Sequence, residues 1–251
     1  MAAQPPAPEP TGLPRAVELA WGLGAGGTRG PRRGLSLEQV VDAAVEVAEA
    51  EGFGAVSMSR VAKQVGYTTM SLYRYVDSKD TLVALMSDRV IGDAPTLDPA
   101  LGWRDALFAW GMAEFESIMR HPWWLDVPLG APPTGPNNMA WLEVGLAAMA
   151  PSGLPEPVKF QLVMNVSFFV IGRTRLVREL SASDPNVDAD FGRIMAQVLD
   201  PERFPAITRA LRAQSFDQDD PNDWEVADFR FGFERLLDGY ERFVETFGRE
   251  Q

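Results

Sequence analysis

Residues 57–79 read SMSRVAKQVGYTTMSLYRYVDSK. Ser57 is a good N-cap for a short predicted helix, and Gly66 is suited to end that helix in the left-handed conformation. Thr68 then caps a second predicted helix over residues 69–75. Two short helices joined through a glycine-containing turn are typical of a helix-turn-helix, whose second helix lies in the major groove of DNA.

The charges of the chain are distributed unevenly. A formal net charge of −12 argues at first against a nucleic-acid-binding protein. Residues 12–92 carry nine basic and nine acidic side chains, whereas residues 93–251 carry 14 basic and 25 acidic ones. Residues 57–79 hold four basic side chains and one acidic side chain. The distribution therefore favours a protein that docks on DNA through one face.

Apolar residues recur with helical spacing along most of the chain. In residues 36–51, one stripe follows the pattern i, i+3, i+4, i+7, i+8, i+11 and predicts an amphipathic helix. The same reasoning predicts further helices over residues 13–21, 78–91, 99–119, 137–149, 156–180, 190–199, 205–213 and 224–247. The proline-rich residues 121–136 are expected to form no regular element. Because no segment shows sustained strand alternation, we expect an all-α fold.

Composition excludes several classes of function. The chain has no cysteine and one histidine, His121, so we expect no disulfide, no metal and no bound cofactor. Neither a glycine-rich phosphate loop nor a catalytic constellation occurs, which argues against an enzyme. The first ten residues do not read as a secretory signal, and the longest apolar run, residues 158–171, is too short and too polar to span a bilayer. We therefore expect a soluble cytoplasmic protein without a membrane partner.

Residues 35–92 resemble the DNA-binding domain of the tetracycline-repressor (TetR) family of bacterial transcription regulators. The resemblance rests on AEAEGF at the end of the first helix, on VSMSRVAKQVG, and on TTMSLYRYVDSKDTLVALM. The most specific piece is SLYRYV followed by SKD and an apolar helix. The rest of the chain is similar only in the number and length of its helices. The resemblance implies a three-helix reading head followed by a variable all-α domain for dimerisation and ligand binding.

Three regions follow from this reading. Residues 1–34 are expected to form a flexible extension with a short helix and a basic arm. Residues 35–92 are expected to form the helix-turn-helix domain, called the reading head below. Residues 93–251 are expected to form an all-helical domain that binds an effector and dimerises.

The resemblance also implies which side chains meet double-stranded DNA. The residues expected to face DNA are Thr69, Met70, Ser71, Tyr73, Arg74 and Tyr75, and those expected near phosphates are Ser57, Ser59 and Lys79. The hydroxyl of Thr68 and the basic arm with Arg32 and Arg33 have the chemistry for further DNA contacts.

Four of these assignments have a structural alternative. Tyr73 could instead belong to the core, and Met70 could pack within the protein. Lys79 could simply be solvated, and the basic arm could be a solvated linker. Position 74 differs widely across such proteins, so the base or phosphate that Arg74 meets stays open.

Aromatic and methionine side chains concentrate between residues 103 and 141. They predict either helix core or an apolar small-molecule pocket, and the implied effector cavity favours the pocket. The candidate lining residues, which extend beyond this stretch to include possible polar groups, are Trp103, Trp110, Phe115, Met119, His121, Trp123, Trp124, Met139, Trp141, Asn165 and Phe169.

Two long helices, residues 156–180 and 224–247, carry more apolar surface than one neighbouring helix would bury. Pairing across a two-fold axis would make a four-helix homodimer interface, although both helices could instead form the core of one chain. A dimer suits a palindromic operator, because a single reading helix makes too few contacts for tight and specific binding.

The sequence therefore predicts a ligand-responsive DNA-binding regulator, specifically a repressor that a small, largely apolar molecule releases from its operator. The alternative is a helical ligand-binding protein whose head no longer binds DNA. The effector, the operator and the choice between repression and activation stay open.

Overall fold

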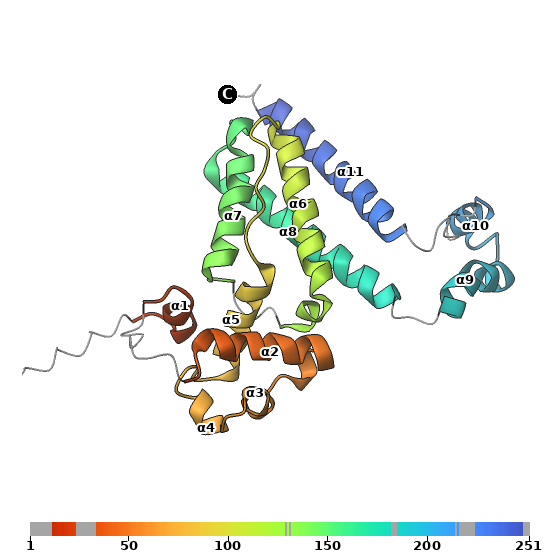
Figure 1. The fold of residues 1–251 in the computed structure, drawn as a ribbon. Coiled ribbons are helices and arrows are strands. Elements are labelled where there is room, and N and C mark those ends of the chain that lie inside the picture. The colour runs from red at the N-terminus through yellow and green to blue at the C-terminus, as the bar shows by residue number, and fades with distance from the viewer. Residues whose placement is uncertain are drawn as a thin grey trace, which may run out of the picture. The chain divides into compact units, whose positions relative to one another are not determined.

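In the computed structural model, every regular element of the described residues is a helix, which confirms the all-α prediction (Figure 1). The structure describes residues 12–23, 34–128, 130, 132–181, 185–213, 215 and 224–247. The α-helices are α1 (Arg15–Ala20), α2 (Leu37–Glu51), α3 (Met58–Val65), α4 (Thr69–Leu72), α5 (Lys79–Ile91), α6 (Trp103–Arg120), α7 (Pro136–Ala148), α8 (Glu156–Ser181), α9 (Pro185–Val198), α10 (Pro205–Arg212) and α11 (Trp224–Phe247). Three short 3₁₀ helices are η1 (Phe53–Ala55), η2 (Pro122–Asp126) and η3 (Ala150–Ser152).

The chain divides into two compact units, residues 1–164 and residues 165–251, and the division falls within α8. The first unit contains the reading head together with α6 and α7. The second unit contains the remainder of α8 with α9, α10 and α11. Among the described residues, no helix combines the length and apolar character that crossing a bilayer requires.

Every α-helix of the reading head begins at a hydroxyl side chain. In each case the hydroxyl oxygen accepts a hydrogen bond from the backbone N–H three residues later, which satisfies one of the unpaired donors of the first turn. The four pairs are Ser36 with Gln39, Ser57 with Arg60, Thr68 with Ser71, and Ser78 with Thr81. Local sequence therefore sets where these helices start.

The reading head has a continuous apolar core. α2 and α5 pack on each other, and α3 and α4 cover one side of the core (Figure 1). Phe53 packs half-buried against this core. The most deeply buried members are Val40, Ala44, Val47, Val61, Leu72, Val76, Leu82 and Met86.

The second helix of the helix-turn-helix is shorter than predicted. The sequence predicted residues 69–75, but α4 ends at Leu72. Beyond it, the N–H of Arg74 bonds to the carbonyl of Ser71 and that of Tyr75 to the carbonyl of Leu72, at 3.4 and 2.8 Å. These tighter three-residue bonds turn the chain so that Val76 enters the core, where it is fully buried.

Prolines explain three further differences from the predicted elements. The stretch 121–136 is not wholly irregular, since η2 begins at Pro122. α9 begins at Pro185 rather than at residue 190, and proline is well suited to a first helical position. The N-terminal helix begins at Arg15 rather than at residue 13, with Pro14 as its N-cap.

In the second unit, α8 and α11 pack through aromatic rings. The Phe169 ring stacks on Phe233 at 5.8 Å between centroids and lies 5.6 Å from Phe229. Gly232 allows this approach, because a Cβ at that position would lie 3.2 Å from the Phe169 ring.

Candidate functional site

The turn between α3 and α4 sets the angle of the reading head's outer surface. Gly66 caps α3 with φ of 76°, a left-handed conformation that favours glycine. Thr68 starts α4 two residues later, and its hydroxyl lies 2.9 Å from the Ser71 hydroxyl. Leu72 fixes the inner side of α4 because its side chain is fully buried. The opposite side of α4 is therefore held outward.

The outward side of α4 and of the turn that follows it, called the α4 surface below, carries large side chains that no described element covers. Met70 is 76% exposed and Tyr73 is 47% exposed, and Arg74 is also exposed. The exposed state of Tyr73 removes the alternative of a core position. Tyr67, which the sequence reasoning did not select, is 45% exposed in the turn between α3 and α4. Its position next to the capping glycine was the available signal.

Other predicted DNA-facing residues differ in exposure. Tyr75 is half-buried and packs on the core of the reading head, so it presents only part of its ring. Thr69 is also half-buried. Ser57 and Ser59 lie side by side at the start of α3, with their hydroxyl oxygens 3.3 Å apart. Arg32 and Arg33 lie outside the described residues.

Lys79 begins α5 and is exposed, but it has an aromatic neighbour. Its Nζ lies 5.4 Å from the centroid of the Phe53 ring, within cation–π range. A lysine at a helix N-terminus opposes the helix dipole, so the ring offsets part of that cost. The ammonium group remains accessible to a phosphate.

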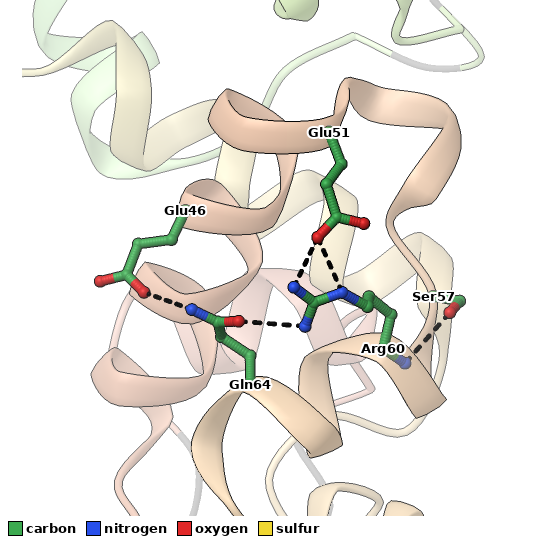
Figure 2. Close-up of polar contacts among 5 residues, drawn as sticks. All are labelled: Glu46, Glu51, Ser57, Arg60 and Gln64. Atoms are coloured by element: carbon green, nitrogen blue, oxygen red, sulfur yellow. Dashed lines mark hydrogen bonds and ion pairs between the residues drawn. The ribbon is translucent and has the colours of Figure 1, made fainter.

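Arg60 fixes α3 against α2 instead of pointing to solvent. Figure 2 shows its guanidinium directed at Glu51, with Nε and Nη2 donating to Oε1 at 2.9 and 2.5 Å. Nη1 donates to Gln64, whose amide donates in turn to Glu46. The hydrogen bond from Arg60 is the main cause that lowers the pKa of Glu51, and the same bond raises the pKa of Arg60. Arg60 is therefore a positioning residue for the helix-turn-helix.

Some of the predicted pocket residues come together between α6 and α7. Trp110 and Trp141 are buried, their ring centroids lie 6.4 Å apart, and the Trp110 indole donates to the Trp141 carbonyl at 2.9 Å. A Cβ at Gly145 would lie 2.8 Å from Val163, so the helices approach closely there. Phe115 is buried on α6. Of the remaining candidates in this region, Trp103 and Met139 are half-buried and Met119 is exposed.

Three other predicted pocket residues contact the reading head. The Trp123 indole and the His121 ring both lie 2.6 Å from the same Oε1 atom of Glu49 on α2. Trp123 is buried in the core of the reading head, and Trp124 packs against that core. Burial is the largest single influence on the pKa of Glu49 and raises it, but the hydrogen bonds with Trp123 and His121 together lower it below its usual value. η2 therefore joins the end of α6 to α2.

The last two predicted pocket residues lie at the seam of α8 and α11. Phe169 is part of the aromatic cluster described above, and Asn165 is hydrogen-bonded to Tyr240. Burial raises the pKa of Tyr240 to about 12, against the smaller opposing effect of Asn165. A separate cavity of about 260 Å³ lies between α9 and α10, and none of the predicted pocket residues lines it.

The sequence reasoning missed two carboxylates that join the reading head to the elements after it. Glu49 is one, and the signal was its place in the AEAEGF motif. Asp88 is the other, buried near the end of α5 and hydrogen-bonded to the start of α7. Its signal was a charged residue on an otherwise apolar helix face.

Comparisons with known proteins agree on one family. Residues 40–86 match the family model described as "Bacterial regulatory proteins, tetR family", and residues 94–244 match "Tetracyclin repressor-like, C-terminal domain". The HTH-type transcriptional repressor DrrR1 of Streptomyces coeruleorubidus is 37% identical over 243 residues, covering 92% of this chain and 87% of DrrR1. An HTH-type transcriptional regulator of Saccharopolyspora erythraea is 32% identical over 140 residues, 55% of this chain and 59% of that protein.

Solved structures share the fold. ActR of Streptomyces coelicolor without ligand superposes with a TM-score of 0.71 at 22% identity, covering 84% of this chain and 97% of ActR. ActR in complex with actinorhodin gives a TM-score of 0.73 at 22% identity, covering 84% and 99%. With its capped helix-turn-helix, its outward α4 surface and family matches over both regions, the chain belongs to the tetR family and is a DNA-binding transcriptional regulator.

Proposed function

We propose that the protein is a homodimeric repressor that sets two α4 surfaces on a palindromic operator and is released by a small, largely apolar effector. The observation that carries this proposal is the exposure of Met70 on α4 and of Tyr73 and Arg74 just after it, while Leu72 on the opposite side of α4 is fully buried. The 37% identical relative is itself named a repressor. Such a regulator acts at the bacterial chromosome, in the cytoplasm.

The chemistry of the α4 surface suits a major groove. Met70 can pack on a thymine methyl group, and Arg74 can read guanine or hold a phosphate. Thr69, Ser71 and Tyr73 add hydroxyl groups at the same surface. The hydroxyls around the starts of α3 and α4 (Ser57, Ser59 and Thr68) and the ammonium of Lys79 are proposed to meet phosphates, while Tyr75 contributes the exposed part of its ring. Arg32 and Arg33 are proposed to extend this contact from the N-terminal side.

The effector is proposed to bind among the aromatic side chains of the region after the reading head. Trp110, Phe115 and Trp141 supply apolar surface, and half-buried Trp103 and Met139 lie on the same two helices. ActR, which shares the fold, has been solved in complex with actinorhodin, so a small molecule can be held by this architecture. The ligand is therefore proposed to be a small, largely apolar molecule.

The dimer is proposed to form through α8 and α11. Both helices keep large apolar side chains exposed although they already pack on each other through buried rings. Phe168 and Phe231 are each 61% exposed, and the others are Phe160, Leu176, Val226 and Phe243. A second copy would remove these side chains from water, at about 25 cal/mol per Å² of apolar surface.

A gel-shift titration tests the DNA-binding surface. The wild-type protein is titrated against the DNA upstream of its own gene and against a scrambled duplex, at two salt concentrations. The double variant Tyr73→Ala/Arg74→Ala is expected to bind the specific duplex at least about 10-fold more weakly, because one base-reading arginine contributes about 1–3 kcal/mol.

A matched control removes one arginine elsewhere. Arg203 is exposed on the connection before α10, so Arg203→Ala changes net charge without touching the α4 surface. Operator affinity of this variant should equal that of the wild type. Undiminished binding by the double variant would remove α4 as the reading element, and absence of salt-dependent DNA binding by the wild type would favour the ligand-binding protein without a functional head.

A further inference from the structure

Asp88 stands out because it is a buried carboxylate on α5, the last helix of the reading head. Its residue is 7% exposed, and it lies three positions before the end of α5. Its oxygens accept from the backbone N–H of Asn137 at 3.3 Å, and from the backbone N–H and side-chain amide of Asn138 at 2.9 and 2.7 Å. A carboxylate on α5 thus occupies the N-terminus of α7.

α7 has no cap from its own sequence. Gly135 is its N-cap residue without a side-chain hydrogen bond, and Pro136 follows at the first helical position. The free N–H groups of the first turn therefore need an outside acceptor, and Asp88 supplies it with favourable charge toward the helix dipole. Glycine is required at position 135 by space, since a Cβ there would lie 2.2 Å from the Asp88 carboxyl carbon.

α6 and α7 also hold the C-terminal end of α5 through hydrogen bonds. The carbonyl of Ile91 accepts from the Ser117 hydroxyl on α6 at 3.0 Å, and the carbonyl of Gly92 accepts from the Trp141 indole on α7 at 3.0 Å. The Asn137 amide also donates to the Asp88 carbonyl at 2.8 Å. Figure 1 shows α5 running from beside α2 toward α6 and α7. Among these contacts, the Asp88 carboxylate is the charged one.

We propose that Asp88 is a positioning residue that sets the orientation of the reading head relative to α6 and α7. This inference rests on the proposed function. Asp88 does not contact DNA, because Lys79 and Asp88 lie nine residues apart along α5, or about 14 Å at 1.5 Å per residue. Asp88 acts through its contact with α7. Because a carboxylate interacts strongly with a helix dipole only at the first turn, this contact favours one arrangement of α5 on α7.

In a dimer, the orientation of each reading head can be tested by comparing binding to a full operator with binding to a half-site. A palindromic operator needs both reading surfaces at a fixed separation, whereas a duplex with one half-site needs one surface only. Loss of the Asp88 anchor should therefore weaken binding to the full operator and leave half-site binding intact. A role in general stability would instead reduce both affinities through a smaller folded fraction.

The experiment compares Asp88→Asn with Asp42→Asn in full-length protein. Asp42 is an exposed carboxylate on the reading head paired with Arg89, so the control makes the same change of charge outside the α5–α7 junction. Fluorescence anisotropy gives affinities for the full operator and for a half-site duplex of equal length. Asp88→Asn should lose at least 10-fold on the full operator and less than 2-fold on the half-site, with Asp42→Asn near wild type on both.

The remaining outcomes are also decisive. Equal full-operator binding by wild type and Asp88→Asn, or a proportional loss on both duplexes in a folded protein, would overturn the inference. If Asp88→Asn does not fold, Asn138→Ala removes one donor to the same carboxylate and should give a smaller loss confined to the full operator. A wild type that binds neither duplex would contradict the proposed function instead.

Discussion

At the scale of single residues, the reading head depends on small polar side chains with defined partners. Each of its four α-helices begins at a serine or threonine that accepts from a backbone N–H three residues later. The guanidinium of Arg60 bonds to Glu51 and Gln64, as Figure 2 shows, and thereby holds α3 on α2. Through these caps and contacts, the helices hold Met70 and Tyr73 outward.

The contact between Gly135 and Asp88 gives a prediction about stability. Gly135→Ala places a Cβ where the Asp88 carboxyl group lies, so α5 and α7 must separate or the side chain must leave its rotamer. Overpacking of this kind costs about 1–3 kcal/mol of unfolding free energy. Urea unfolding followed by circular dichroism measures it. Gly130→Ala is the matched control, since a Cβ at that position meets nothing within 4 Å; equal stability of the two variants would contradict the packing argument.

At the scale of elements, three of the helix–helix contacts depend on residues that the sequence did not single out as partners. α5 meets α7 through Asp88, α2 meets η2 through Glu49, and α8 meets α11 through Phe169. The aromatic residues predicted as one pocket are thus distributed over three places. Trp110 and Trp141 lie between α6 and α7, Trp123 lies against the reading head, and Phe169 lies against α11.

The seam of α8 and α11 makes a prediction about alkaline pH. Burial raises the pKa of Tyr240 from 10.0 to about 12, so the folded protein favours the neutral phenol. The stability that depends on a neutral Tyr240 is fully present below pH 10. It is lost as the pH rises toward 12, because Tyr240 ionises at lower pH in the unfolded chain than in the folded one. Thermal unfolding between pH 8 and 12 should show a steeper fall for the wild type than for Tyr240→Phe. Parallel curves for the two proteins would show that Tyr240 is not buried as described.

At the scale of the whole molecule, the proposed function requires two copies of the chain. The apolar side chains that α8 and α11 leave exposed are the surface available for this, and Phe168 and Phe231 are the most exposed of them. The acidic excess of residues 93–251 keeps that part of the molecule away from the phosphate backbone, so that DNA is approached through the reading head.

Charged substitutions at the proposed interface should prevent dimerisation and weaken operator binding without unfolding the chain. Phe168→Glu/Phe231→Glu introduces four negative charges per dimer at a surface that is apolar in the wild type. We expect a monomer by sedimentation and at least a 100-fold loss of operator affinity, with the helical content unchanged. The control Val198→Glu alters a 67% exposed apolar residue on α9 and should stay dimeric. A double variant that remains dimeric would place the interface elsewhere.

The sequence by itself determined the all-α fold and the internal structure of the reading head. Helix caps and turns are made by residues three to five positions apart, so consecutive residues encode them directly. Periodic apolar positions likewise identified the buried faces of α2 and α5. The exposure of Tyr73 excludes a core position for it, whereas the end of α4 at Leu72 and the 3₁₀ helix at Pro122 differ from the predicted elements.

Only the tertiary structure decided how the reading head is attached. The partners of Glu49 and Asp88 lie between 49 and 74 residues further along the chain, so their hydrogen bonds depend on where helices cross and not on local pattern. The same holds for Trp123, whose aromatic ring suits a ligand pocket and a core equally well until its neighbours are known. A buried carboxylate costs free energy unless donors surround it, and three donors at the start of α7 are what make Asp88 a stable junction.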